Sequence, residues 1–99
     1  KFNKITVSTV ADTRAWIFPP KAIEVFTSKD GQQFEKIHEK QFPALKKDID
    51  SSLSFLTEVF ENQESKFLRI IVKNYGVLPE WHPGKGFGSW LFIDEILIE

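Results

Sequence analysis

The sequence predicts an all-β protein, an antiparallel sandwich or barrel built from six strands. Three observations carry this prediction. Short apolar segments with the two-residue alternation of half-buried strands recur along the chain. Polar turns separate these segments, and Asp30-Gly31 is the strongest hairpin signal among them. No segment has a clear helical period, so an all-β class is favoured over a mixed one.

Six segments are expected to be strands. The third could also be a helix, because Phe34, Ile37 and Phe42 lie at helical spacing and Glu, Lys and Gln are weak strand formers. The Asp-Gly turn directly before it favours a strand. In chain order the six segments are Lys4–Thr9, Lys21–Ser28, Gln33–Glu39, Leu53–Glu61, Phe67–Asn74 and Trp90–Ile98.

Length and composition narrow the class of protein. The 99 residues form one domain at most, 1–99, and a chain of this size buries about 60–70% of its unfolded surface. The formal net charge of −1 gives no electrostatic support for binding nucleic acid or an anionic membrane. No apolar run approaches the ~20 residues of a membrane span. There is no cysteine, which excludes disulfides and thiolate zinc sites.

The connections between strands are expected to fall into two groups. If successive strands are antiparallel, the short turns at 30–31 and 62–66 share one end of the domain, and the long loops at 11–20, 41–52 and 75–89 share the other. The long loops contain or border all three tryptophans. Ordered loops that carry aromatic residues commonly build binding surfaces, so we expect function at this end and the C-terminus at the opposite one.

Several segments resemble parts of a discoidin domain, also called an F5/8 type C domain. The middle of such a domain is similar to W-I-F-P-P-K-A-I-E-V-F-T-S-K-D-G-Q-Q-F-E-K-I. The family's aromatic-hydrophobic-Arg-Ile strand is similar to K-F-L-R-I-I-V-K-N, and its closing strand is similar to W-L-F-I-D-E-I-L-I. The version appended to bacterial family 20 glycoside hydrolases, the β-hexosaminidases or chitobiases, resembles this chain in the loop W-H-P-G-K-G-F-G-S-W. The match covers essentially the whole chain, in the family's order and spacing.

The resemblance implies a β-sandwich jelly roll of the galactose-binding type. It further implies a non-catalytic carbohydrate-binding accessory module of a chitobiase or β-hexosaminidase, periplasmic or secreted. The partners would be an N-acetylglucosamine- or galactose-type glycan and a neighbouring catalytic domain. One alternative is an architectural module that packs against the catalytic domain without binding sugar, and a third class is protein or lipid recognition.

The resemblance starts only partway into such a domain. We therefore expect a partial domain, excised from a larger protein and lacking the family's first strands. The N-terminal loop that often supplies calcium ligands in this family is also missing, so we expect no cofactor.

Trp16 and Trp81 lie within the long loops and are the candidate sugar-stacking residues. Indole rings can stack on the apolar faces of sugars while neighbouring polar groups bind the hydroxyls. The alternative is that each ring plugs the open end of the sandwich, because tryptophan is usually well buried. Phe18, Phe87 and Trp90 are expected to belong to the core.

Four further residues at this end are candidates for ligand contact. His82 would hydrogen-bond a sugar hydroxyl or, in the alternative, bond to loop carbonyls and hold the glycine-rich turn in shape. Arg14 and Lys85 could reach a ligand, although such side chains are more often simply solvated. Tyr75 has an amphipathic ring that suits a binding role or a structural one.

A structural ion pair is expected between Arg69 and an acid of the last strand. The neighbours of Arg69 make its strand apolar on both faces, so its guanidinium needs a carboxylate. Asp94 and Glu95 should point to opposite faces of their sheet, which leaves one of them on a largely apolar face where an isolated carboxylate is costly. Glu95, between Ile93 and Leu97, is the preferred partner.

The sequence gives little support for catalysis. Asp94 and Glu95 cannot work as paired acid and base if they face opposite sides of a sheet. Nucleophile motifs, metal-type histidine clusters and phosphate loops do not occur. Asp48 and Asp50 form a weak cation-binding pattern that a solvated loop explains as well. We therefore expect neither an enzyme nor a metal site.

Overall fold

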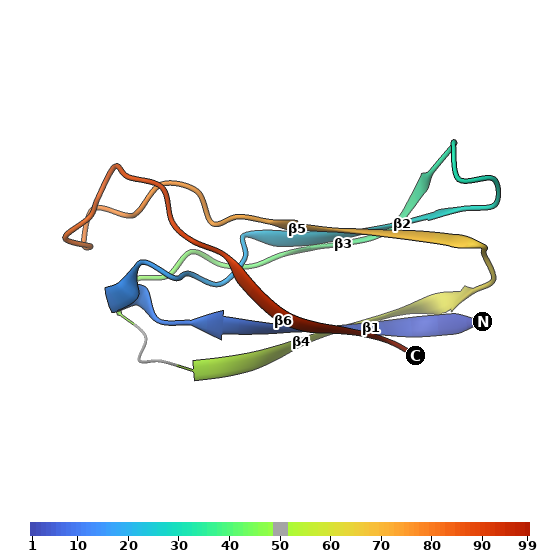
Figure 1. Ribbon diagram of the computed structural model, residues 1–99, viewed down its shortest axis with the longest axis horizontal. Coiled ribbons are helices and arrows are strands. Elements are labelled where there is room, and N and C mark those ends of the chain that lie inside the picture. Colours follow the sequence, from blue (N-terminus) through green and yellow to red (C-terminus); the bar gives the residue numbers. More distant parts are fainter. Residues whose placement is uncertain (49–51) are drawn as a thin grey trace.

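The computed structural model describes residues 1–48 and 52–99 and shows a nearly all-β protein. Two three-stranded antiparallel sheets face each other, so the predicted sandwich is confirmed (Figure 1). The third predicted segment is a strand rather than a helix. The elements are β1 (Phe2–Ala11), the 3₁₀ helix η1 (Thr13–Ala15), β2 (Ala22–Ser28), β3 (Glu35–Gln41), β4 (Ser52–Gln63), β5 (Phe67–Lys73) and β6 (Phe92–Ile98).

Each sheet has an early strand at its centre. The first sheet has the order β4-β1-β6 and the second the order β3-β2-β5. The Asp30-Gly31 turn lies between β2 and β3, as its sequence predicts. Gly31 has a φ of 80°, in the left-handed region that glycine reaches without the steric cost of a Cβ atom.

The core lies between the two central strands. Ile5 and Val7 of β1 and Ile23 and Val25 of β2 are fully buried. Their spacing of two residues follows from the pleat, which turns alternate side chains to the same face. Partly buried hydrophobic side chains from β3, β4, β5 and one loop pack around them, and these are Ile37, Phe42, Leu56, Phe60, Leu68, Ile70 and Val72.

The outer face of the β3-β2-β5 sheet is polar. Glu24 of β2 is 7% exposed and accepts a hydrogen bond of 2.8 Å from Lys36. The ammonium group of Lys73 lies 3.5 Å from the same carboxylate. These contacts satisfy a carboxylate that is otherwise largely removed from water.

Exposed apolar side chains lie on the outer face of the β4-β1-β6 sheet along its edge strands β4 and β6, whereas the central strand β1 places Lys4, Thr6 and Ser8 there. Residues directly opposite each other in a ladder share a face, so the register identifies the side chains on this surface. Its large hydrophobic side chains, which are 44% to 63% exposed, are Leu53, Phe55, Val59, Phe92 and Leu97. A sheet that faced only water would be expected to alternate polar residues there.

The connections divide between the two ends as predicted. The segments 12–21, 42–48 and 74–91 lie at one end, which we call the loop end (Figure 1). The turns β2–β3 and β4–β5 lie at the other, the hairpin end, together with both chain termini. The described part of the chain contains no helix long and apolar enough to cross a membrane.

Candidate binding site at the loop end

An aromatic cluster fills the loop end, and Phe18 is its centre. Phe18 is fully buried, as expected from the sequence. Its ring centroid lies 4.7 Å from that of Tyr75, 5.6 Å from that of His82 and 6.0 Å from that of Trp81. The cluster therefore brings three of the predicted site residues together, but around a buried ring that no ligand can reach.

His82 is a structural residue of this cluster. It is 3% exposed, and the backbone N–H of Gly84 donates a hydrogen bond of 2.9 Å to its Nδ1 atom. Because Nδ1 accepts, the ring hydrogen is on Nε2, which donates to the backbone carbonyl of Thr13. Both ring nitrogens are thus occupied by loop backbone, which fits the alternative prediction that His82 holds the glycine-rich turn in shape.

Trp81 and Tyr75 hold the neighbouring loop in place. The indole Nε1 of Trp81 donates a hydrogen bond of 3.1 Å to the carbonyl of Leu45, and the Tyr75 hydroxyl accepts one of 3.0 Å from the backbone N–H of Leu45. Both side chains are half-buried. Trp81 therefore fits the alternative prediction of a ring that closes the open end of the sandwich.

Trp16 has a backbone conformation that is rare for its residue type. Its φ is 68°, and it is the one residue other than glycine with a positive φ in the described part of the chain. Bulky residues in this region are strained, and such strain often accompanies a binding site. Its ring is 36% exposed and stacks on Phe87, with centroids 6.0 Å apart and planes 28° apart.

Gly84 allows the close packing beneath Trp16. A Cβ atom at this position would lie 2.8 Å from Cζ2 of Trp16 and 2.8 Å from Cδ1 of Leu78, which is shorter than van der Waals contact allows. The edge of the Trp16 ring also meets His82, at 6.2 Å between centroids. The exposed ring of Trp16 is thus supported from below by buried atoms.

Two residues assigned to the core by the sequence are exposed instead. Phe87 is 65% exposed and Trp90 is 62% exposed. Trp90 precedes β6 and is fixed through its backbone, because its N–H donates to the carbonyl of Trp16 and its carbonyl accepts from the N–H of Phe18. Its side chain is therefore free to face solvent. We call the stacked pair of Trp16 and Phe87 the exposed aromatic platform.

The two predicted cationic residues lie on the surface. Arg14 is exposed in η1. Lys85 is exposed as well, and its ammonium group lies 3.6 Å from a carboxylate oxygen of Glu80, whose side chain is also exposed. Neither residue is part of the buried cluster, so both are available to a ligand that meets the loop end.

A small cavity opens beside the aromatic cluster. Its volume is about 220 Å³. Both polar and aromatic side chains line it, namely Lys21, Gln41, Phe42, Ala44 and Tyr75. Of these, only Tyr75 was a candidate from the sequence. The remaining residues come from the last residue of β3 and from the connections next to β2 and β3, where a strand pattern gives no sign of a cavity.

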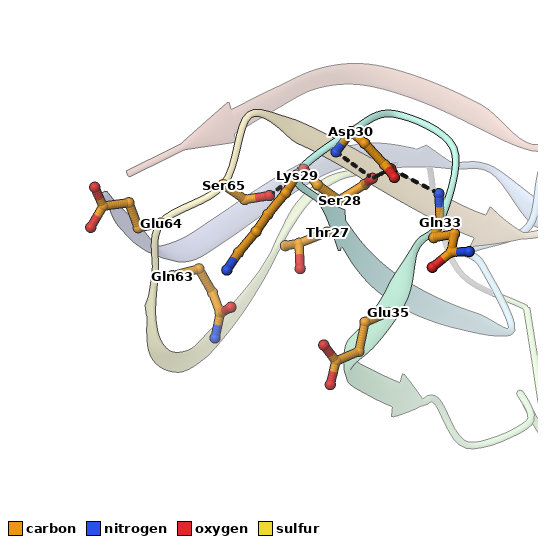
Figure 2. A pocket seen from close by; sticks show the side chains of 9 residues that line it. All are labelled: Thr27, Ser28, Lys29, Asp30, Gln33, Glu35, Gln63, Glu64 and Ser65. Atoms are coloured by element: carbon orange, nitrogen blue, oxygen red, sulfur yellow. Dashed lines mark hydrogen bonds between the residues drawn. The ribbon is translucent and has the colours of Figure 1, made fainter.

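A polar pocket of about 300 Å³ occupies the hairpin end (Figure 2). Its lining residues are Thr27, Ser28, Lys29, Asp30, Gln33, Glu35, Gln63, Glu64 and Ser65. Hydrogen bonds from the backbone N–H groups of Gln33 and Gln32 and from the Ser28 hydroxyl hold the pKa of Asp30 below its ordinary value. No aromatic ring lines this pocket, so it lacks a surface on which a sugar could stack.

The structure does not join Arg69 to Glu95. Arg69 lies on β5, on the exposed face of the β3-β2-β5 sheet, and its guanidinium is 3.9 Å from the centroid of the Phe34 ring. Glu95 lies on β6 in the other sheet. Within residues 1–48 and 52–99 no ion pair links them. Because inward and outward residues alternate on β5, Arg69 reaches solvent and needs no buried carboxylate.

The weak cation pattern is only partly described. Asp48 accepts a hydrogen bond of 2.9 Å from the Thr13 hydroxyl, and Asp50 lies outside the described residues. Among the residues that the structure describes, no group of three or more His, Asp or Glu side chains could hold a metal ion.

Comparison with known proteins gives no family or relative for this chain: no protein-family model matches it, and no curated protein matches it.

Proposed function

We propose that this chain is a non-catalytic carbohydrate-binding module that binds a glycan at the loop end, through the exposed aromatic platform. The observation that carries the proposal is the stacked pair Trp16 and Phe87, which presents aromatic surface to solvent above a packed cluster. A rigid ring loses little conformational entropy when it binds. The loop end therefore offers a preorganised surface for the apolar face of a sugar ring.

Polar groups at the same end would bind the sugar hydroxyls. Arg14 and Lys85 are exposed, and Lys21 and Gln41 line the cavity beside Tyr75. The pocket at the hairpin end has more polar groups but no ring, so the loop end is the better glycan site.

The resemblance to discoidin domains supplies the biological setting of the proposal. In that setting the domain is a jelly roll that belongs to a bacterial chitobiase or β-hexosaminidase, periplasmic or secreted. It keeps the catalytic domain near N-acetylglucosamine- or galactose-type sugars, and tethering raises the effective concentration of substrate.

The test is a titration with a panel of mono- and disaccharides, followed by amide chemical shifts. We expect saturable shifts at the loop end, lost in Trp16→Ala and Phe87→Ala. Phe55→Ala is the matched control, because Phe55 is 63% exposed on the sheet face and Phe87 is 65% exposed on the platform. Retained binding in Trp16→Ala, or equal loss in the Phe55 control, would contradict the proposal.

The second candidate is an architectural module that packs against a neighbouring domain and binds no sugar. The exposed hydrophobic side chains of β4 and β6 on the outer face of the β4-β1-β6 sheet favour it, because exposed apolar patches mark interaction sites. A lack of response to every sugar, together with self-association that is relieved by Phe55→Ser, would favour this candidate over the first.

A further inference from the structure

All side chains of β6 are exposed, although the strand is apolar on both faces of its sheet. Its large hydrophobic residues are 38% to 49% exposed, and these are Phe92, Ile93, Ile96, Leu97 and Ile98. A strand that is apolar on both faces is typical of the middle of a sheet, with neighbours on both sides and layers above and below. Yet β6 lies at an edge, next to β1 only.

At least two of these five side chains face the inside of the sandwich. Ile96 and Ile98 lie directly opposite Val7 and Ile5, which belong to the buried core, so they share its face. The inward residues of β5, the corresponding edge of the other sheet, are half-buried and pack around the core. In the described part of the chain no strand pairs with the far edge of β6, and no side chain of β6 takes part in the packing around the core.

The backbone of β6 is arranged to receive such a strand. Lys4 and Glu99 exchange two hydrogen bonds, of 2.9 and 3.1 Å, so they form a hydrogen-bonded pair of the β1–β6 ladder. Hydrogen-bonded and non-hydrogen-bonded pairs alternate in an antiparallel ladder. Ile98 and Ile96 therefore direct their N–H and C=O groups away from β1, toward the free edge. Unpaired groups in such a row are a template for another strand.

The two acidic residues of β6, Asp94 and Glu95, determine which charge an added strand must carry. A β-bulge between Ser8 and Thr9 leaves Asp94 without a ladder partner, and its carboxylate accepts a hydrogen bond of 3.5 Å from the Ser8 hydroxyl. Glu95 lies directly opposite the same serine. The bulge thus gathers two carboxylates around Ser8. Neither has a cation among the ion pairs of the described residues.

We propose that the free edge of β6 binds an extended segment of another polypeptide that alternates apolar residues and carries basic residues opposite Asp94 and Glu95. The backbone of the bound segment would form hydrogen bonds with Ile96 and Ile98. Its inward side chains would cover the exposed side chains of these two isoleucines. Its basic residues would neutralise Asp94 and Glu95. A second copy of β6 fits less well. In the antiparallel registers centred on the acidic pair, Asp94 and Glu95 would meet the same acids of the copy.

The test uses the whole 99-residue chain and two synthetic peptides. Both alternate valine and threonine; two successive threonines at the centre are replaced by lysine in one peptide and by glutamate in the other, so that both charges lie on one face of the added strand. The readouts are the dissociation constant and the hydrogen exchange of the amides of Ile96 and Ile98. We expect the lysine peptide to bind and slow this exchange, and the glutamate peptide to bind at least about tenfold more weakly.

Two variants make the test specific to the edge and its charges. The double variant Asp94→Lys, Glu95→Lys should reverse the preference between the peptides. Ile96→Pro should abolish binding while it keeps the fold, because proline removes a donor on the free side of the ladder only. Circular dichroism checks the fold of each variant.

Three results would overturn the proposal. They are no binding of the lysine peptide, equal affinity for both peptides, and protection of Ile96 and Ile98 in a dimer that forms without peptide. The last result would show that a second copy occupies the edge.

Discussion

His38 and Glu58 join the two sheets: the imidazole Nε2 of His38 lies 2.7 Å from Oε1 of Glu58, between β3 and β4. Both side chains are largely buried, with exposed fractions of 22% and 14%. Opposite Glu58 in the β1–β4 ladder is the core residue Ile5, so this contact lies on the inner face of its sheet. It ties together two edge strands from opposite layers.

Removing this contact should destabilise the sandwich. We expect Glu58→Ala to lower the free energy of unfolding by about 1–3 kcal/mol, because it leaves a half-buried imidazole without its acceptor. Urea denaturation measures the change. Glu61→Ala, an exposed position on the same strand, is the control and should change stability by less than about 0.5 kcal/mol. Equal effects of the two substitutions would contradict a stabilising role for the pair.

His82→Leu should destabilise the loop end. The substitution keeps a side chain of similar size but leaves the Gly84 N–H without its buried acceptor. It also removes one of the two hydrogen bonds to the Thr13 carbonyl, which still accepts from the Trp16 N–H. An unsatisfied buried group costs about 1–3 kcal/mol. Thermal unfolding measures the loss, and Lys85→Ala in the same loop is the control. An unchanged midpoint in His82→Leu would show that these hydrogen bonds contribute nothing to stability.

Gly84→Ala and Gly88→Ala should differ sharply. A Cβ atom at Gly84 would meet Trp16 and Leu78 at 2.8 Å, whereas nothing lies within 4 Å of a Cβ atom at Gly88. We expect Gly84→Ala to cost about 1–3 kcal/mol through overpacking and to change the fluorescence of Trp16. Gly88→Ala should leave both properties nearly unchanged. A tolerated Gly84→Ala would mean that Trp16 is not packed against this turn.

The free energy of unfolding should decrease at acidic pH, and part of this decrease should come from protonation of Glu24. The hydrogen bond from Lys36 holds the pKa of Glu24 below its ordinary value of 4.5, and Lys36 lowers the pKa of Glu39 in the same way. A carboxyl whose pKa is lowered in the folded state stabilises the protein above its unfolded pKa. This contribution is lost as the pH falls below 4.5 through the folded value.

The variant Lys36→Met tests the source of this pH dependence. It removes the donor to both carboxyl groups, so its free energy of unfolding should vary less with pH in that acidic window than that of the wild type. Denaturation at a series of pH values gives both curves. Parallel curves would assign the acid dependence to other carboxyl groups.

The fold could be predicted from local patterns in the sequence. The alternation around Ile5, Val7, Ile23 and Val25 identifies the inner faces of the two central strands. Asp30-Gly31 identifies the hairpin, and it also settled the choice between strand and helix for the segment after it. Once the strands were known, antiparallel succession placed the long loops at one end.

The site was harder to predict, because it depends on features that have no sequence period. The bulge beside Ser8 places Asp94 and Glu95 around one residue, although simple alternation puts them on opposite faces. The sequence pattern places Trp90 at the start of a buried strand. In the structure its backbone forms hydrogen bonds with the loop that contains Trp16, and its ring is exposed to solvent. The position of Phe87 among glycines was the one available sign that its ring could be exposed to solvent.

Both termini lie at the hairpin end, and the molecule measures 45 × 23 × 18 Å (Figure 1). A chain immobilised through either terminus therefore stands upright, with the rings of Trp16 and Phe87 facing the solution and the attachment point at the far end. Terminal biotin or a terminal fusion gives a uniformly oriented layer in which the aromatic platform stays accessible. Lysine coupling gives mixed orientations, because Lys21 and Lys85 lie at the loop end itself.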